Sequence, residues 1–329
     1  MFFRRSIITA SLAAVALSAG VYKPTGCYAS APGSETMYVH PELRGVLIRG
    51  HWKQIEPSPG VFDLSRIDSQ LSAVKRHGKR WSLAISAGGA GQPDWLVDTL
   101  GIPSVKFRFR GQTEYRLAAF WHEKTFERLA ILADELGKRY AGDASLVLVY
   151  VPQMTVNGIE GHLQGVDMNE MRRIGYSDDA WVSASLGATR AYAKAFPEKA
   201  LAFEVHEIDR SAEVPIRIMN TIADDASLGG RVGIAVWWLS GNEQYQSSLL
   251  AALRVFKGDI YCQMIGRSDQ TERYPANGYA GAWKHAKALK ARYVEPWEWD
   301  FESGKRGANG KWDAELKAFN EFADAINLK

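Results

Sequence analysis

Two glutamates that lie far apart in the chain, Glu160 and Glu295, each follow a short apolar run. A pair of facing carboxyl groups can perform acid and base chemistry: a protonated one donates to a leaving oxygen, and an ionised one attacks or activates water. Tryptophans around such a pair would raise the pKa of whichever carboxyl serves as the acid. Glu160 and Glu295 are therefore the candidate catalytic residues, although Glu160 equally suits the cap of a following helix.

Polar and aromatic residues also close the other apolar runs. Guanidinium and amide groups orient carboxylates and hydroxyls, and indole faces stack against the C–H faces of sugars. Glu204 alternates with apolar neighbours, so packing inside the core is as good an interpretation as contact with a ligand. Tryptophans are more often core residues than ligand contacts, although for Trp95, in a loop, the two interpretations are equally good. The candidate binding residues are Arg49, Trp52, Trp95, Asn157, Glu204, Gln263 and Trp297.

The elements that must position these side chains are short apolar runs separated by longer amphipathic segments. Residues 146–151 are apolar at nearly every position, which is typical of parallel strands covered on both faces. Segment 123–140 and the C-terminal segment each place apolar residues on one helical face. The predicted strands lie within 45–52, 80–89, 145–154, 200–207, 232–241, 259–266 and 291–297.

This alternation predicts an α/β protein, a single (β/α)8 TIM barrel over residues 37–329, with an open doubly wound sheet as the alternative. MYVHPEL, residues 37–43, is expected to supply the eighth strand. The glycines of 88–91 lack the spacing of a phosphate-binding fingerprint, which argues against a nucleotide-binding sheet. In a barrel, functional side chains project from the C-terminal ends of the strands, where the candidates above are found.

Residues 47–96, LIRGHWKQIEPSPGVFDLSRIDSQLSAVKRHGKRWSLAISAGGAGQPDWL, carry a family resemblance. They resemble the opening strands of clan A (β/α)8 glycoside hydrolases, especially family 42-type β-galactosidase domains. A looser similarity continues to about residue 165. The resemblance implies a barrel that hydrolyses glycosidic bonds without a cofactor, while Glu56 itself is expected to hold the loop after the strand. The motif positions are Trp52, Glu56, Pro57, Gly60, Phe62, Asp63 and Asp68.

The chain departs from the clan pattern at two strand ends. Where the clan has Asn-Glu after the fourth strand, this chain has PQMTVNGIEG, and the resemblance implies that Glu160 is the acid/base, with Asn157 nearby. The clan's nucleophile, a glutamate ending the seventh strand, falls on Gln263, an amide that cannot attack an anomeric carbon. Three interpretations stay open: Glu295 ends the nucleophile strand after a recount, the protein works without the standard nucleophile, or it binds sugar without cleaving it.

Residues 1–30 are predicted to be a signal peptide and linker. Two arginines precede an apolar stretch at 7–19 that ends in small residues, as in secretory leaders, and either Sec or twin-arginine export fits. The stretch is short for a membrane span. Cys27 follows it, so lipid attachment at this residue is an alternative. We expect a secreted or periplasmic protein.

The balance of charge excludes some partners. The 40 Lys+Arg against 37 Asp+Glu give a formal charge of +3 with mixed signs, unlike a nucleic-acid binder. His51, His162 and His206 lack metal-ligand spacing, and Cys262 is expected to be a free core thiol. Glu298, Asp300 and Glu302 are expected to lie in a solvated loop. We expect an exported glycoside hydrolase acting on a poly- or oligosaccharide; the alternative is a non-catalytic carbohydrate-binding barrel.

Overall fold

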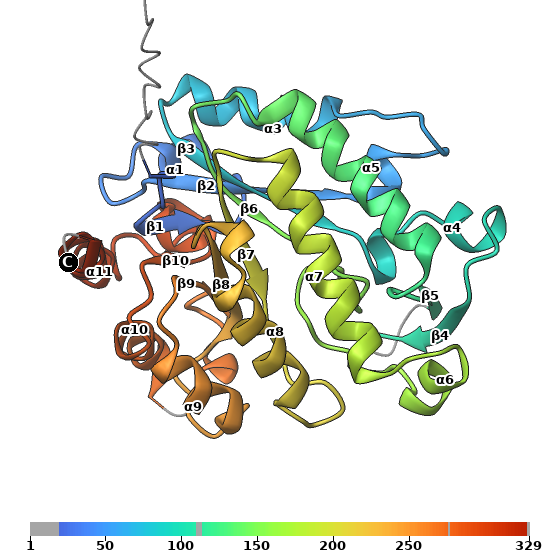
Figure 1. Cartoon of the computed structure of the whole chain (residues 1–329). Helices are drawn as coiled ribbons and strands as arrows, with labels where there is room; N and C mark the ends of the chain where they lie inside the picture. The colour runs from blue at the N-terminus through green and yellow to red at the C-terminus, as the bar shows by residue number, and fades with distance from the viewer. Residues whose placement is uncertain (1–19, 110–113, 276, 328–329) are drawn as a thin grey trace, which may run out of the picture.

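The computed structural model describes residues 20–109, 114–275 and 277–327, which form a closed barrel of eight parallel strands surrounded by helices (Figure 1). Each strand pairs with the next along the chain, and the last pairs with the first, so no sheet edge is left open. The predicted (β/α)8 barrel is confirmed. Its strands are β1 (Gly26–Ala29), β2 (Gly45–His51), β3 (Arg80–Ser86), β6 (Leu146–Tyr150), β7 (Ala200–Glu204), β8 (Val232–Leu239), β9 (Ile260–Met264) and β10 (Tyr293–Glu295).

The helices follow from apolar spacing and from capping side chains. The α5 helix buries Leu129, Leu132 and Leu136 on one face, and the His122 ring accepts a hydrogen bond from the Lys124 N–H at its start. Ser177 caps α7 in the same way. The helices are α1 (Glu35–Tyr38), α2 (Trp52–Ile55), α3 (Ser65–Arg76), α4 (Trp95–Asp98), α5 (Glu123–Tyr140), α6 (Met168–Arg173), α7 (Asp178–Ala195), α8 (Glu213–Asp224), α9 (Ser247–Val255), α10 (Gly278–Ala288) and α11 (Asp313–Asn327), with 3-10 turns η1 (Gly89–Gly91), η2 (Ala226–Leu228), η3 (Thr271–Arg273), η4 (Glu298–Phe301) and η5 (Gly304–Arg306).

The eighth strand is not MYVHPEL. Residues 35–38 form α1 and the chain then turns through Pro41, a residue that cannot donate to a strand ladder. The strand that closes the barrel is β1, GCYA, which pairs with β10 and β2. The predicted boundary at residue 30 between the leader and linker and the barrel domain therefore falls too late, because β1 belongs to the barrel. The apolar stretch of the leader, expected at 7–19, lies outside the described residues.

Burial of Cys27 contradicts lipid attachment at its sulfur. The side chain is fully buried in β1, and its thiol lies 3.6 Å from the Leu316 carbonyl oxygen of α11. A lipid chain on this atom would have to pass through the packed interface between strand and helix. Cys27 and Cys262 are both free and buried, as predicted for Cys262.

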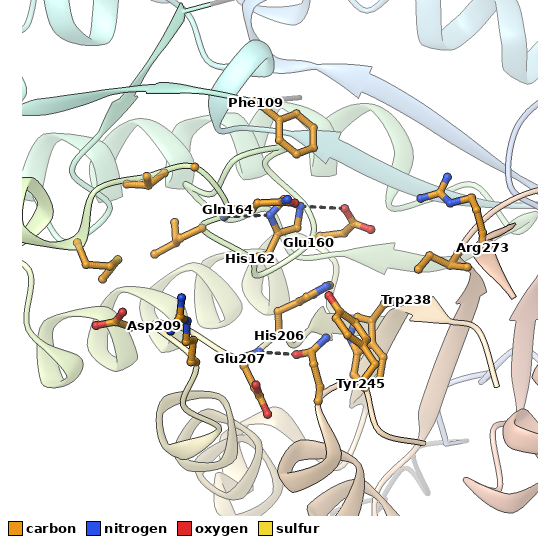
Figure 2. A pocket seen from close by; sticks show the side chains of 17 residues that line it. Phe109, Glu160, His162, Gln164, His206, Glu207, Asp209, Trp238, Tyr245 and Arg273 are labelled. Atoms are coloured by element: carbon orange, nitrogen blue, oxygen red, sulfur yellow. Dashed lines mark hydrogen bonds and ion pairs between the residues drawn. The ribbon is translucent and has the colours of Figure 1, made fainter. Parts of the chain in front are cut away.

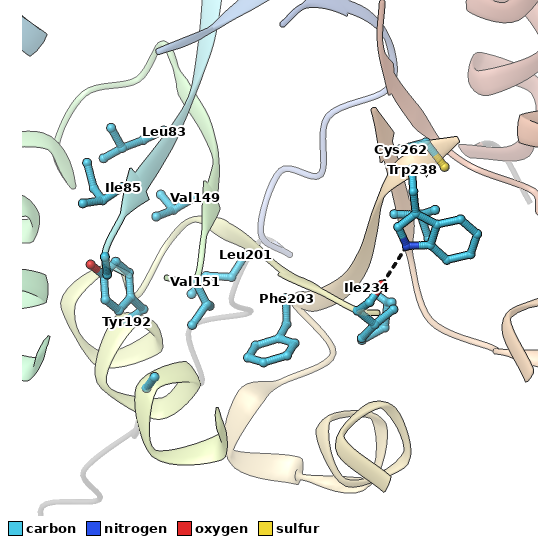
Figure 3. Close-up of a cluster of buried hydrophobic side chains, with 14 of the residues drawn as sticks. Leu83, Ile85, Val149, Val151, Tyr192, Leu201, Phe203, Ile234, Trp238 and Cys262 are labelled. Carbon is cyan, nitrogen blue, oxygen red and sulfur yellow. Dashed lines mark hydrogen bonds between the residues drawn. The ribbon is translucent and has the colours of Figure 1, made fainter. Parts of the chain in front are cut away.

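Side chains alternate between two cores along each barrel strand. In β7, Leu201 and Phe203 point outward to the helices, where they join the cluster in Figure 3. Ala200 and Ala202 instead point into the barrel, which is filled by tyrosines, alanines and larger apolar side chains such as Leu47 and Trp237. Period-two alternation then directs Glu204 inward at the end of the strand.

An antiparallel hairpin, β4 (Ser104–Arg108) and β5 (Glu114–Ala118), is inserted between β3 and α5. It lies outside the barrel sheet, and β4 packs near α6 (Figure 1). Gly165, in the loop after β6, approaches the Arg108 carbonyl so closely that a Cβ would collide with it. The hairpin thereby brings Phe109 over the rim of the barrel.

Candidate active site

Four inward-facing residues meet at the C-terminal end of the barrel because each follows an inward-facing residue by two positions. Arg49 follows Leu47, Gln263 follows Tyr261 and Glu295 follows Tyr293, and the three leading residues lie in the barrel interior. Glu204 reaches the same end from β7. Because the strands are parallel and in register, side chains that lie far apart in the sequence form one layer at this end of the barrel.

Glu295 lies in a closed hydrogen-bonded network below the barrel mouth. Its side chain is fully buried; one carboxylate oxygen accepts from the Tyr150 hydroxyl at 3.0 Å and from Tyr293, and the other accepts from the Gln263 amide at 2.6 Å. Burial raises the pKa of Glu295 above its ordinary value, against the opposing effect of these donors and the Arg49 charge. The predicted position of this carboxyl at the mouth is wrong, because the network encloses it.

Arg49 links this network to the aromatic residues above it. Its guanidinium donates to the Gln263 side-chain oxygen at 3.1 Å, and lies 4.9 Å from the ring centre of Trp237 and 5.9 Å from that of Trp297. The half-buried Trp297 indole donates to the Met264 carbonyl at 3.0 Å. Arg49, Gln263, Glu295 and Trp297, all predicted site residues, are therefore brought together.

An open cleft of about 620 Å³ lies beside this layer, among the loops that follow β6, β7, β8 and β9 (Figure 2). Glu160 enters it from the loop after β6, opposite aromatic residues of β8 and the loop beyond. Trp238, Tyr245 and Phe109 supply apolar faces, while Glu160, Glu207 and Arg273 supply charge. A cleft that mixes aromatic faces with carboxylates is suited to a polyhydroxylated ligand.

Contacts within its own loop hold Glu160 in place. The Asn157 side-chain oxygen accepts from the Glu160 backbone N–H at 2.8 Å, and the Asn157 amide donates to the Glu160 carboxylate. That carboxylate also contacts His162 Nε2 at 3.3 Å. Burial alone would raise the pKa of Glu160, but the His162 hydrogen bond and the charges of His206 and Arg49 outweigh it, so the pKa lies below its ordinary value. Glu160 is therefore ionised.

Glu204 lies under the cleft wall and forms an ion pair with His206. His206 Nδ1 is 2.9 Å and 3.0 Å from the two Glu204 oxygens, and the Gly161 and Trp237 backbone N–H groups also donate to this carboxylate. Burial raises the pKa of Glu204 against these contacts. Burial would lower the pKa of His206, but the charges of Glu204, Glu160 and Glu207 raise it overall.

Trp52 and Trp95, predicted as ligand contacts, belong instead to a buried cluster behind β2. The Trp52 indole donates to the Glu56 carboxylate at 2.8 Å, and the Trp95 indole to the Glu56 carbonyl at 3.0 Å. Glu56 also accepts from Gly60 N–H at 2.8 Å and pairs with Arg128. The expected structural role of Glu56 is therefore confirmed, and its motif shapes the loop after β2.

The acidic stretch after β10 is less exposed than predicted. Asp300 is 1% exposed and accepts from the Tyr279 hydroxyl at 2.7 Å, and Glu302 is 7% exposed and accepts from the Ser34 N–H at 2.6 Å. Glu298 is half-buried near Ser30. Glu298 and Glu302 thus contact the segment after β1 and Asp300 contacts α10, so the prediction of a solvated loop is wrong.

His162, His206, Trp238 and Tyr245 line the cleft, but they were not predicted from the sequence as site residues. His162 and His206 lie 5.3 Å apart between ring centres, and His206 lies 5.8 Å from Trp238. The spacing of Glu204 and His206 was the available signal, since alternation places both on one face of an extended segment. Across residues 20–109, 114–275 and 277–327, no group of histidine, cysteine and acidic side chains is arranged to hold a metal ion.

No family model and no curated protein matches this chain in sequence. Solved structures match it in fold. The catalytic domain of β-amylase from Paenibacillus polymyxa superposes with a TM-score of 0.63 at 9% identity, covering 92% of this chain and 98% of that one. Endo-glycoceramidase II from Rhodococcus sp. gives 0.53 at 12%, covering 88% and 77%. Xylanase 10B from Thermotoga maritima gives 0.52 at 11%, covering 83% and 82%.

These neighbours are (β/α)8 glycoside hydrolases, and at such identities they establish only the fold that this chain shares with them. They do not single out family 42. Within the described parts of the chain, no helix combines the length and apolar character needed to cross a membrane.

Proposed function

We propose that this chain hydrolyses O-glycosidic bonds of an oligo- or polysaccharide bound in the cleft, with Glu160 as its reactive carboxylate. The observation that carries the proposal is the position of Glu160: it is a partly exposed carboxylate on the cleft wall, held by Asn157 and His162, with Trp238 and Tyr245 lining the same cleft. An ionised carboxylate beside the anomeric carbon can attack it or activate water.

In this proposal Glu295 acts through its neighbours. It fixes the Gln263 amide, whose oxygen fixes the Arg49 guanidinium, and Arg49 contributes positive charge that favours ionised Glu160. Its four donors leave it no free direction toward a substrate. Glu295 is thus a positioning residue, and the low pKa of Glu160 makes that residue a nucleophile or base in the free protein.

The test is a screen of the purified protein against chromogenic glycosides and bacterial polysaccharides, beside the variants Glu160→Gln and Glu135→Gln. Glu135 is a matched control because it pairs with Lys138 on the outer surface of α5. We expect Glu160→Gln to lose at least about 10³-fold of the wild-type rate, with Glu135→Gln unchanged. Equal rates in the wild type and Glu160→Gln would remove Glu160 from the reaction.

A second candidate function is carbohydrate binding without cleavage, and Gln263 on β9 favours it. Counting from β1, β9 is the seventh strand and β10 the eighth, so Glu295 does not take over the nucleophile strand. Calorimetric binding of oligosaccharides with no product after prolonged incubation would support this function over hydrolysis. Introducing Gln263→Glu then asks whether a carboxylate at this position creates turnover.

We further propose that the protein is exported by a leader within residues 1–25. The arginines and apolar stretch support a leader, and β1 sets the limit, because cleavage after Gly26 would damage the barrel. N-terminal sequencing of the mature protein from periplasmic or culture fractions tests this proposal. An uncleaved chain found only with cytoplasmic markers would contradict it.

A further inference from the structure

His206 is a second titratable residue of the cleft wall, at a position separate from Glu160. It belongs to the cleft wall but is only 5% exposed, and it comes from the segment just after β7 (Figure 2). Its ring lies between His162 and Trp238, which restrict its rotation. The orientation of the imidazole is therefore set by packing as well as by hydrogen bonding.

The two ring nitrogens of His206 have different environments. Nδ1 contacts both oxygens of Glu204, which is itself held by the backbone N–H groups of Gly161 and Trp237. Nε2 has no hydrogen-bond partner within the part of the chain that the structure describes. It is also not one of the atoms that are fully buried without a partner, so it can be reached from the cleft. The carboxylate behind the ring thus orients it with Nε2 available to a ligand in the cleft.

Resting on the proposed function, we propose that His206 is the proton donor to the leaving group, with Glu204 as its positioning residue and Glu160 as the carboxylate that attacks. The carboxyl groups that face His206 are Glu204 from β7, Glu207 from the same loop as His206, and Glu160 from the loop after β6. All three are acidic, and together they favour the imidazolium over the neutral ring. His162 is a further titratable neighbour, and it contacts Glu160; Tyr245 lines the same cleft.

In the proposed reaction, His206 gives up a proton in the first step and regains one in the second. As the bond between C1 and the glycosidic oxygen breaks, the Nε2 proton passes to that oxygen and a Glu160 oxygen bonds to C1, so the aglycone leaves as an alcohol. A water molecule then gives a proton to neutral His206 while its oxygen bonds to C1 and the Glu160 carboxylate leaves. Both groups return to their starting charge.

The test compares leaving groups. An alkyl glycoside or natural oligosaccharide needs a proton on the departing oxygen, whereas a dinitrophenyl glycoside of the same sugar leaves without one. We expect His206→Gln to lose about 10²- to 10⁴-fold in kcat/KM on the first kind of substrate and less than about tenfold on the second. His162→Gln is the matched control, because it removes a neighbouring imidazole that does not contact Glu204. In this variant, kcat/KM should change by similar factors on the two substrates.

Glu204→Gln provides a second readout. It keeps the shape of the side chain but removes the charge next to Nδ1, so the basic limb of the pH profile should move to lower pH, and an NMR titration should show His206 losing its proton at lower pH than in the wild type. If the wild type hydrolyses both substrates and His206→Gln slows them equally, the donor role fails while the proposed function stands. If the wild type hydrolyses neither, both fail together.

Discussion

Gln263 and Glu295 are paired residues on adjacent strands, and the Gln263 amide donates to the Glu295 carboxylate at 2.6 Å. The seventh strand thus ends in a neutral donor, and the carboxyl group lies one strand further on. An amide at this position allows Glu295 to be buried without a second negative charge beside it, because the amide supplies a hydrogen bond instead.

Replacing Gln263 by Glu should therefore destabilise the protein in a pH-dependent way. Two carboxyl groups at hydrogen-bond distance share one proton, so the pKa of the pair rises, and stability is lost as pH rises through the raised value. We expect a loss on the order of 2 kcal/mol at pH 7.5 and a smaller one at pH 4.5. Urea unfolding at both pH values measures it; a loss independent of pH would contradict this explanation.

His162→Leu should move the acid limb of activity to higher pH. His162 lowers the pKa of Glu160 through a hydrogen bond and its charge, so its removal raises that pKa and protonates Glu160 earlier as the pH falls. The rate on the plateau above the limb should change far less. A pH profile of kcat/KM on a dinitrophenyl glycoside measures the shift, and an unmoved limb would show that Glu160 does not define it.

Trp52→Phe should lower stability without changing substrate affinity. The substitution leaves the buried Glu56 carboxylate without its indole donor, which costs about 1–3 kcal/mol, while Gly60 and Arg128 still contact it. Trp95→Phe, which removes a bond only to the Glu56 backbone carbonyl, serves as the milder comparison. Thermal unfolding and KM are the measurements, and a raised KM in Trp52→Phe at unchanged stability would restore its predicted sugar contact.

Asp300→Asn should stabilise the protein at neutral pH. Burial raises the pKa of Asp300 from 3.8 to about 6, so the unfolded state ionises first as pH rises from 4 to 6, and the free energy of unfolding falls by about 3 kcal/mol. The amide keeps an acceptor for Tyr279 and does not ionise. Guanidinium unfolding should give a gain of up to about 3 kcal/mol at pH 7.5 and little change at pH 4. A gain of equal size at both pH values would mean that ionisation is not the cause.

Truncation should locate the start of the barrel. A chain beginning at Gly20 retains β1 and should unfold cooperatively, whereas one beginning at Pro32 lacks β1 and leaves the edges of β10 and β2 unpaired. We expect the shorter chain to aggregate or to bind hydrophobic dyes. Cooperative unfolding of both chains by circular dichroism would place the barrel boundary near residue 30 after all.

Most strands were predicted from the sequence because each lies within a continuous run of mainly apolar residues. Residues 146–150 are apolar on both faces, so burial against the barrel core and the helices follows directly from composition. Strand β1 was not predicted because its four residues, GCYA, lie within the stretch 1–30 that the sequence assigns to the leader and linker, and one of them is a glycine at φ +86° that fits between Asn320 and Arg44. Its place in the barrel becomes apparent only from its pairing with β10 and β2.

The site was predicted in part for a similar reason. Alternation within a strand correctly brings Arg49, Gln263 and Glu295 to one end of the barrel, but it says nothing about how deep each side chain lies. Glu295 is enclosed because Tyr150 and Ser82 come from strands that a local pattern does not relate to it. The cleft itself is built by loops, and their paths depend on contacts such as that between Gly165 and the Arg108 carbonyl.

The contact between β1 and α11 joins the first and last described elements of the chain. The Asn320 side-chain oxygen in α11 accepts the Cys27 backbone N–H at 2.8 Å, and Arg44 joins the same junction through Asp324. Because β1 pairs with β10 and packs against α11, the barrel cannot close until the ribosome has made the chain as far as α11. The first strand of the barrel therefore stays unpaired on one side for most of the time that this part of the chain is being synthesised.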